Sequence, residues 1–275
     1  MQDNFRSVFR PDIGLKSKLP LNLQSIGHRI VSRPGVMVPL YMSYSIVFDW
    51  IVKGAARAVI DGEEYDLNAS ALMIVLPGST CEVHLEQGTV EGWRLAIDGS
   101  EMHSLINDMC LWNGVFPIRD VPESRLRGIL ETAEDNKREY PLRIVADACG
   151  VVMHGVTDRD KSAPDKWVHE AMKLIMMEWQ DPDLNVNTIA DRLKIHRTTL
   201  SSRFREFERC TVLDRIHKKR LKEVTIRLEN NALTVNEIAT ECGFSNANYM
   251  IRLFKRRYGC TPGDYRKNLY HHISV

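Results

Sequence analysis

Polar residues that can read DNA bases gather near the C-terminal end of the sequence. Asn246, Asn248 and Arg252 lie near the start of an expected helix, and Lys255 lies further along it. In a major groove, Asn pairs with adenine and Arg with guanine through two hydrogen bonds each. An ordinary solvated helix face is the alternative for any one of these residues alone. Together, their types indicate contact with double-stranded DNA.

A similar set of residues stands about 50 positions earlier. Ile189 corresponds to Ile238 at an offset of 49 residues, and Phe204 corresponds to Phe254 at an offset of 50. Arg205 follows in a position to reach a phosphate. In place of the second copy's base-reading residues, the first copy has Arg197, Thr198, Ser201 and Ser202. Matching types over this length predict two copies of one structural unit.

Each copy has the pattern of a short helix, a tight turn and a longer helix. In the second copy, Gly243 can take the positive φ that a sharp corner needs, and Ser245 follows where an N-cap belongs. Two units of this kind, each with a polar first turn and a basic later turn, are typical of DNA-binding proteins.

The segment between the two copies, from Val212 to about Glu229, has the length and composition of one helix. It would span roughly 27 Å. This length helps to place two recognition helices about one turn of duplex apart, ~34 Å, on one face of the DNA. We expect its basic cluster to lie near the DNA backbone: Lys218, Lys219, Arg220 and Lys222.

Charge is distributed unevenly along the 275 residues. The chain carries 37 Lys and Arg against 36 Asp and Glu, but residues 166–275 hold 20 basic and 13 acidic residues. Residues 1–165 hold 17 basic and 23 acidic residues. An acidic front and a basic back indicate that the C-terminal part alone meets a polyanion.

Composition argues against several classes of protein. The longest unbroken apolar run, residues 71–76, is far shorter than the ~20 residues that cross a bilayer, and the N-terminus lacks a signal pattern. The six cysteines form no C-x-x-C motif, so we expect reduced, packed thiols and no structural zinc site. A cytoplasmic protein is the resulting expectation.

Short strands broken by turns are expected from about residue 23 to 99. Apolar residues alternate along 44–52, and the pairs Asp61-Gly62 and Pro77-Gly78 are turn signals. Strands at this spacing predict a small sandwich or barrel. Residues 1–20 show no sustained period and are predicted to be an irregular lead-in.

Helical spacing replaces this pattern after residue 99. Apolar residues recur at helical intervals from 102 to 109 and from 126 to 133. Helices over about 100–157 could cap the barrel or pair with a second copy of the chain. The polar stretch 158–165 shows no periodicity and is the predicted linker between two domains.

Four segments of the second copy carry a specific motif: Val-Asn-Glu-Ile-Ala at 235–239, Cys-Gly-Phe-Ser at 242–245, Phe-Lys-Arg-Arg-Tyr-Gly at 254–259 and Thr-Pro-Gly-Asp-Tyr-Arg at 261–266. With these segments, residues from about 166 to 270 resemble the DNA-binding domain of AraC/XylS-type transcription regulators. The first copy departs at Lys194 and Arg209, where Gly is usual, and at His196, where an N-capping Ser is usual. Met250 replaces the usual aromatic residue of the second copy.

The front half resembles the cupin-like effector domain that is often attached to this DNA-binding unit. The resemblance rests on the strand and turn rhythm of residues 48–54, 60–62 and 72–78. It implies a small barrel that binds an effector, often a sugar, and a helical region that pairs two chains. The implied function is a transcription regulator, an activator, that binds promoter DNA as a homodimer; a contact with RNA polymerase is a further expectation.

The expected fold is therefore α+β, with an N-terminal cupin-like β-barrel, trailing helices and a C-terminal all-α domain whose two helix-turn-helix motifs are joined by a long helix. The expected effector-binding and dimerisation domain covers 1–157, the linker 158–165 and the DNA-binding domain 166–275. Polar and aromatic groups expected to face the barrel interior, and so to bind the effector, are Trp93, Arg94, His84, Trp50, Tyr44, Tyr41 and Arg29. Trp93 is the first choice, because a Trp on this strand resembles the family's ligand-stacking position.

Two other functions remain as alternatives. One is a regulator whose front half only dimerises and binds no ligand. The other is a metal-dependent cupin enzyme fused to a DNA-binding domain, but such enzymes use a His-x-His pair, which the front half lacks. The nearest approach is His84-Leu85-Glu86. We therefore expect no catalytic residues, no metal and no cofactor.

Overall fold

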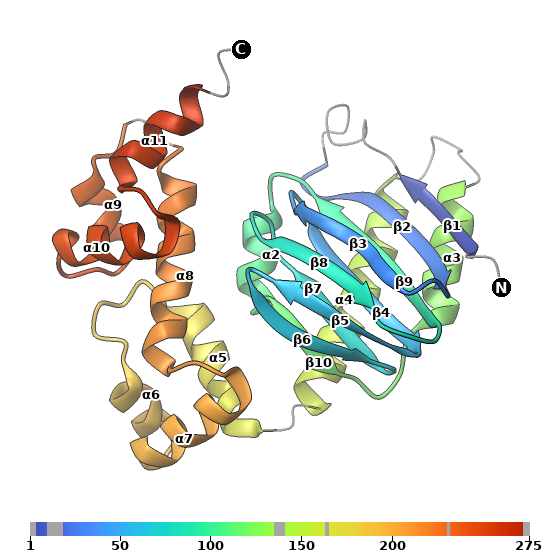
Figure 1. Ribbon diagram of the computed structural model, residues 1–275, viewed down its shortest axis with the longest axis horizontal. Coiled ribbons are helices and arrows are strands. Elements are labelled where there is room, and N and C mark those ends of the chain that lie inside the picture. The colour runs from blue at the N-terminus through green and yellow to red at the C-terminus, as the bar shows by residue number, and fades with distance from the viewer. Residues whose placement is uncertain (1–3, 10–18, 135–140, 163–164, 230–231, 272–275) are drawn as a thin grey trace. The chain divides into compact units, whose positions relative to one another are not determined.

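The computed structural model describes residues 4–9, 19–134, 141–162, 165–229 and 232–271. The chain forms two compact units, Met1–Pro164 and Asp165–Val275, each with its own hydrophobic core. The first unit contains the strands and the second is helical (Figure 1). The predicted α+β class, with a β-rich front and an all-α back, is confirmed.

The described part of the first unit contains ten strands: β1 (Asn4–Phe9), β2 (Asn22–Val31), β3 (Gly35–Met42), β4 (Ile46–Lys53), β5 (Ala55–Ile60), β6 (Glu63–Asn68), β7 (Ala71–Val75), β8 (Thr80–Leu85), β9 (Val90–Asp98) and β10 (Gly114–Pro117). They form a large sheet in the order β1-β2-β9-β4-β7-β10 and a small sheet in the order β3-β8-β5-β6. Neighbouring strands are antiparallel throughout.

Alternating residues of the large sheet build two separate apolar layers. On β4, Ile46, Phe48 and Trp50 belong to one layer, whereas Val47 and Ile51 belong to the other. The second layer is shared with the small sheet and fills the space between the two sheets. The first layer lies on the opposite face, where helices cover it. The large sheet is therefore buried on both faces, and every residue of β7 is buried.

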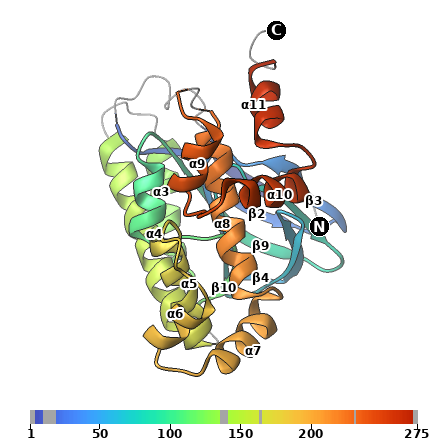
Figure 2. The same cartoon turned by 90° about the vertical axis from the view of Figure 1, so that its left-hand side faces the viewer.

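Within the described residues of the first unit, three helices accompany the sheets: α2 (Met102–Asp108), α3 (Glu123–Glu134) and α4 (Pro141–Ser162). Figure 2 shows α3 and α4 side by side, and both contact β2 of the large sheet. Leu126 and Ile129 of α3 and Val151 and Val152 of α4 complete the apolar layer on this face. The amphipathic spacing read from the sequence thus serves to cover the large sheet.

The edges of the large sheet differ from the sequence prediction. β1 lies within residues 1–20, which were predicted to be irregular, and β10 interrupts the stretch predicted to be helical. Both strands are outermost in the sheet. Phe5 of β1 is 68% exposed, so this strand has little of the alternation that marks a half-buried strand, and β10 is only four residues long.

The predicted linker, 158–165, is also wrong in part. Helix α4 continues to Ser162, residues 163 and 164 lie outside the described ranges, and Asp165 caps the next helix. Asp165 Oδ1 accepts hydrogen bonds from the backbone N–H groups of Trp167 and Val168 at 2.9 and 3.0 Å. A run of charged residues was read as a linker because it lacks apolar periodicity, but such residues are also compatible with a helix.

Seven helices form the described part of the second unit: α5 (Lys166–Glu178), α6 (Val186–Arg192), α7 (Arg197–Glu208), α8 (Val212–Arg227), α9 (Val235–Glu241), α10 (Ala247–Tyr258) and α11 (Pro262–His271). The predicted long connecting helix is confirmed as α8, with three helices on either side of it along the chain (Figure 1). Capping boxes at Asn185, Thr211 and Thr234 fix the starts of α6, α8 and α9. None of the helices in the described ranges combines the length and apolar character that crossing a membrane requires.

Candidate nucleic-acid interface and effector site

Helix α10 presents the second predicted set of DNA-binding residues. Met250 and Phe254 are buried in the core of this unit, whereas Asn248, Arg252 and Lys255 are exposed. The helix is therefore held by one side and offers its polar side to solvent, which is the arrangement that a groove-reading helix needs.

The start of α10 corrects the predicted N-cap by one residue. Asn246, not Ser245, is the N-cap, and its Oδ1 accepts a hydrogen bond from Tyr249 N at 3.0 Å. A bidentate contact with adenine uses both the oxygen and the NH₂ group of Asn. The structure thus gives the Asn246 oxygen a role in helix capping, while Asn248 takes no part in the cap.

Helix α7 presents the first predicted set. Arg197, Thr198, Ser202 and Arg205 are exposed, and Ser201 is half-buried. The helix is capped by His196, whose Nδ1 accepts from Thr198 N at 3.4 Å and lies 2.7 Å from the Thr198 hydroxyl. Thr198 is consequently engaged in the helix start, as Asn246 is in the second copy.

Both copies need a residue with positive φ at the turn and at the end of the recognition helix, and they place different residue types there. Gly243 has a φ of +74°, and a Cβ there would lie 2.6 Å from the carbonyl oxygen of Gln180. The equivalent residue of the first copy, Lys194, adopts a φ of +54°. At the ends of the two recognition helices, Gly259 has a φ of +78° and Arg209 a φ of +55°. Two non-glycine residues of the first copy therefore hold a left-handed conformation that costs about 1–2 kcal/mol each.

Two of the four residues in the basic cluster of α8 are held in structural contacts, which corrects the prediction that the whole cluster lies along the DNA backbone. Arg220 is 5% exposed, and it donates from Nε to Trp179 O at 2.7 Å and from Nη2 to Asp181 O at 2.6 Å. Lys219 is bound to Glu223 at 2.8 Å and lies over the Trp179 ring. A run of basic residues does not reveal which of them face the core.

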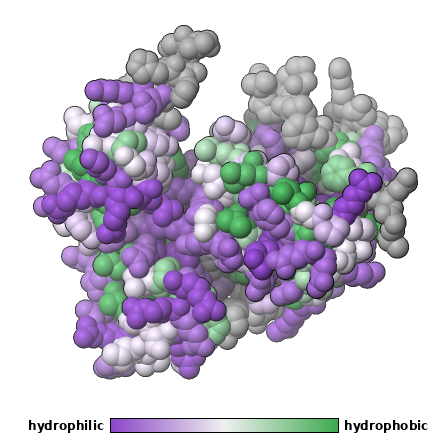
Figure 3. All heavy atoms as spheres, in the orientation of Figure 1, coloured by the Kyte–Doolittle hydropathy of each residue, from purple (hydrophilic) through white to green (hydrophobic). Residues whose placement is uncertain are grey.

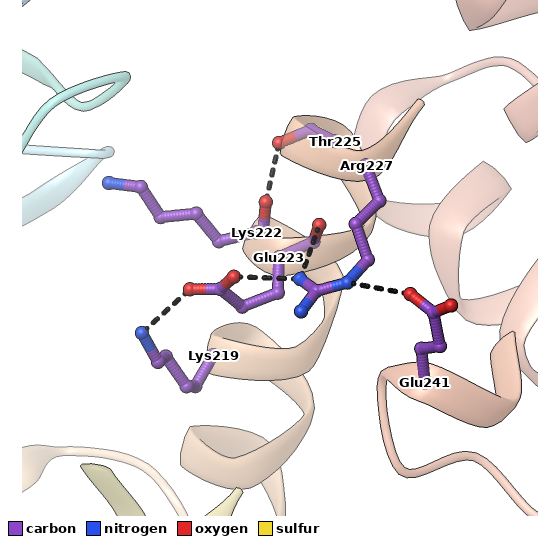
Figure 4. Close-up of polar contacts among 6 residues, drawn as sticks. All are labelled: Lys219, Lys222, Glu223, Thr225, Arg227 and Glu241. Atoms are coloured by element: carbon purple, nitrogen blue, oxygen red, sulfur yellow. Dashed lines mark hydrogen bonds and ion pairs between the residues drawn. The ribbon is translucent and has the colours of Figure 1, made fainter. Parts of the chain in front are cut away.

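Figure 4 shows the ion-pair network that fixes this part of α8. Glu223 accepts from Lys219 and from Arg227, the latter at 2.9 Å, and Arg227 also reaches Glu241 of α9 at 3.3 Å. Burial by itself would raise the pKa of Glu223, but Lys219 and Arg227 outweigh it and lower that pKa. Lys222 points away from this group of side chains (Figure 4). The network ties α8 to the second helix-turn-helix copy.

Residues 189–268, which contain both copies, match a protein family described as a helix-turn-helix domain. The xylose operon regulatory protein of Escherichia coli (strain K12) is 32% identical over 132 residues, which are 48% of this chain and 33% of that protein. The probable transcription factor PqrA of Proteus vulgaris is 28% identical over 102 residues, which are 37% of this chain and 84% of PqrA. The C-terminal unit contains an AraC-type helix-turn-helix domain.

The chain thus spans about a third of the length of the xylose operon regulatory protein. A solved structure of ToxT from Vibrio cholerae aligns with 89% of this chain and 98% of the ToxT chain at 16% identity, with a TM-score of 0.38.

Hydrophilic residues cover most of the visible surface of the AraC-type domain (Figure 3, purple).

The seven predicted effector residues lie outside the AraC-type domain, and four of them do not face the space between the sheets. Trp50 and Trp93 are buried in the layer under the helices. His84 alternates with the interior residues of β8, and its Nε2 lies 3.2 Å from Glu82 Oε1. Tyr44 is 78% exposed. The prediction that these side chains line an interior is therefore wrong.

Trp93, the first choice among them, is fixed by its neighbours. It is 1% exposed, and its ring lies 4.7 Å from that of His28 and 5.9 Å from the guanidinium of Arg127. Its Nε1 donates to Glu123 at 3.5 Å. Alternation along a strand shows which residues share a face, but it does not show which face another layer covers.

The other three, Arg29, Tyr41 and Arg94, lie between the sheets, where the two arginines meet at Asp49 and Tyr41 lies beside Arg94. Arg94 donates from Nε to Asp49 Oδ1 at 2.9 Å and from Nη2 to Oδ2 at 2.8 Å, and Arg29 donates from Nη2 to Oδ1 at 3.1 Å. The Arg94 guanidinium lies 5.7 Å from the centre of the Tyr41 ring. We call Arg29, Tyr41, Asp49 and Arg94 the interior polar cluster.

Asp49 is the member of the cluster that sequence reasoning missed. It is fully buried, and burial would raise its pKa, but Arg94 and Arg29 outweigh burial and hold that pKa below its ordinary value. The signal was present in the sequence, because Asp49 is the one charged residue in the apolar run 46–52. A buried carboxylate needs a charged partner, so the run indicated an ion pair within the sheet.

Metal binding has little structural basis in the described ranges. They contain no group of three or more His, Cys, Asp and Glu residues that could hold a metal ion. Around His84, the closest approach to a cupin metal motif, Glu86 is paired with Arg57 at 2.7 Å.

Proposed function

We propose that this protein is a sequence-specific transcription regulator, an activator, that binds promoter DNA and responds to a small-molecule effector. The observation that carries the proposal is the pair of capped, exposed recognition helices, α7 and α10, which are connected through α8 in one basic unit. Two such helices can enter successive major grooves on one face of a duplex. The same proposal places the protein in the cytoplasm, together with the promoter.

The exposed polar residues of α7 and α10 are the proposed DNA contacts. Arg252 and Asn248 have side chains suited to base edges, whereas Arg205 and Lys255, later on each helix, suit phosphates. Arg197 and Ser202 extend the surface of α7. For Asn246 and Thr198 the proposed contribution is to hold the helix start against the DNA, because both side chains take part in the caps.

The β-rich unit is the proposed effector domain. Curated relatives of the AraC-type domain include regulators named for the xylose and Msm operons and the activator RhaR. These names support a sugar or a related metabolite as the effector. We further propose that two chains pair through the helical region of residues 100–157, where Met153 of α4 is 57% exposed, and that the bound dimer contacts RNA polymerase.

Selection of bound fragments from a genomic DNA library tests the proposal. The purified chain should enrich fragments that share two half-sites about one helical turn apart. The double variant Arg197→Ala/Arg252→Ala should lose this enrichment, whereas Arg57→Ala, an exposed substitution on β5, should keep it. Equal retention of all fragments by the unmodified chain would show that the protein does not read sequence.

A further inference from the structure

The interior polar cluster holds more positive than negative charge. Asp49 is fully buried, and the side chains of Arg29 and Arg94 are 7% and 25% exposed. Burial raises the pKa of the Cys81 thiol nearby to about 12 and raises the pKa of Tyr41 as well, so both stay neutral at neutral pH. Two guanidinium groups therefore share a single carboxylate, and one positive charge is left over.

The surplus charge belongs to Arg29. Arg94 binds both oxygens of Asp49 in a two-pronged contact, whereas Arg29 makes one hydrogen bond to the same carboxylate. Arg29 Nε and the Tyr41 hydroxyl are buried without a hydrogen-bond partner in the described structure. Burial, together with the charge of Arg94, lowers the pKa of Arg29 despite the opposing effect of Asp49. A buried, incompletely bonded guanidinium is costly unless another acceptor completes it.

Glycines face both arginines across the strand pair. Directly across the strand pair from Arg94 stands Gly27, and directly across from Arg29 stands Gly92. Neither glycine places a side chain against a guanidinium, but the space is close-packed, because a Cβ at Gly27 would lie 2.8 Å from Ser7 Cβ and one at Gly92 would lie 2.6 Å from Trp50 O. The Arg94 side chain is 25% exposed, so solvent reaches the cluster at Arg94, whereas the Tyr41 hydroxyl is buried.

We propose that Arg29, Arg94 and Tyr41 bind the carboxylate group of an organic acid, so that the effector is a monoanion and not a neutral sugar. The inference rests on the proposed effector function of this unit and specifies its ligand class. One carboxylate matches the single surplus charge, and its oxygens can accept from the Arg29 N–H and the Tyr41 O–H. Charge-assisted hydrogen bonds of this kind are the stronger ones, and Arg is the residue best suited to carboxylates.

Acetate and benzoate serve as probes, because they carry the proposed group without assuming the rest of the effector. The full chain, with ¹⁵N-labelled arginine, is titrated with each acid while the Nε–H signals are recorded at constant pH and ionic strength. The Nε–H signals of Arg29 and Arg94 are assigned as those missing from the spectra of Arg29→Met and Arg94→Met. Each of these two signals should shift in a saturable way as acid is added to the unmodified chain. The neutral analogues acetamide and benzamide should leave these signals in place.

Two variants separate binding from folding. Arg29→Met leaves the neutral Arg94–Asp49 pair intact, so it should stay folded and bind benzoate at least tenfold more weakly. Tyr41→Phe removes a buried hydroxyl that lies beside the Cys81 thiol. Because a thiol is a weak hydrogen-bond partner, the variant should bind benzoate several-fold more weakly with little change in melting temperature. Arg57→Met, on the exposed side of the small sheet, is the matched control and should bind as the unmodified chain does.

The outcomes distinguish this inference from the proposed function. The anion site is refuted if acetate and benzoate shift no arginine signal. It is also refuted if the Arg94 signal shifts as much in Arg29→Met as in the unmodified chain. If D-xylose shifts the same signals while the acids do not, the effector domain stands and the ligand class is wrong. DNA binding is measured on the same samples without ligand. If the unmodified chain does not bind DNA, the proposed function as a transcription regulator is wrong, while the anion site is unaffected.

Discussion

At the scale of single residues, the helix position of each arginine determines what it can recognise. Arg252 lies within α10 beside residues suited to base edges, whereas Arg205 lies in the last turn of α7. A base contact discriminates among sequences, but a phosphate contact does not. The two arginines should therefore differ in the kind of binding that they support.

Arg252→Ala should cost ~1–3 kcal/mol of binding free energy and relax the preference at one base pair. Arg205→Ala should weaken all sequences alike and lower the salt dependence by about one phosphate contact. Fluorescence anisotropy on operator and scrambled DNA at several salt concentrations measures both effects. Arg57→Ala, on the exposed side of β5, serves as the control, and a uniform loss in Arg252→Ala would reassign that residue to the phosphates.

Asp49 should dominate the electrostatic stability of the β-rich unit. Asp49→Asn leaves two buried guanidinium groups without a counter-charge and should lower the free energy of unfolding by about 3–5 kcal/mol at neutral pH. Because Arg94 and Arg29 hold the pKa of Asp49 down, its contribution is complete above the ordinary Asp pKa of about 3.9 and disappears as pH falls through the lowered value.

Urea unfolding followed by tryptophan fluorescence, repeated at stepwise lower pH, measures this contribution. Glu64→Gln, on the exposed side of β6, is the matched control and should change stability by less than about 0.5 kcal/mol. Equal losses in the two variants, or a gap between Asp49→Asn and the unmodified chain that widens as the pH is lowered below about 3.9, would contradict the expectation.

At the scale of elements, the first helix-turn-helix copy is strained where the second is not. Lys194→Gly and Arg209→Gly should each raise the free energy of unfolding of the second unit by about 1 kcal/mol. Glycine adopts the left-handed conformation without strain. The greater conformational entropy of glycine in the unfolded chain offsets only part of this gain. Chemical denaturation of the variants measures the gain. No gain at either site would mean that the side chains make contacts worth more than the strain.

Gly243→Ala should have the opposite effect. It combines a positive φ with a Cβ 2.6 Å from the Gln180 carbonyl oxygen, so the turn must shift. Gly128→Ala in α3 controls for the Gly-to-Ala replacement at a site without steric conflict, because its Cβ would meet nothing within 4 Å. It should raise the free energy of unfolding of the first unit by roughly 0.5–1 kcal/mol.

The sequence identifies some elements better than others for physical reasons. The helix-turn-helix copies were predictable because their apolar periodicity repeats at a nearly constant offset, and because Gly243 and Gly259 mark the turns of the second copy. β1 and β10 were not, since edge strands are short or exposed and lack alternation. Of the predicted effector residues, Arg29, Tyr41 and Arg94 lie between the sheets, and their role in binding an effector stays a prediction. Trp93 and Trp50 were misplaced because no single strand reveals that α3 and α4 cover its other face.

At the scale of the whole molecule, the two units have separate cores and should unfold in separate transitions. Trp93→Ala empties a buried site between sheet and helices and should destabilise the first unit by about 3–5 kcal/mol. The transition of the AraC-type domain should stay in place, while Phe254→Ala should move it and leave the first unit unchanged. Differential scanning calorimetry measures both, and a joint shift in either variant would show that the units fold as one.

Because the large sheet is buried on both faces, ligand binding should change deuterium uptake by backbone amides throughout the β-rich unit. β9 and β4 are inner strands covered on both faces, so their backbone amide protons can exchange with deuterium only when the whole unit opens. Arg94 and Asp49 stand on these two strands, and Arg29 stands on β2 next to them. An anion held by this cluster would therefore slow deuterium uptake across the entire β-rich unit, and not merely at the strands that it touches.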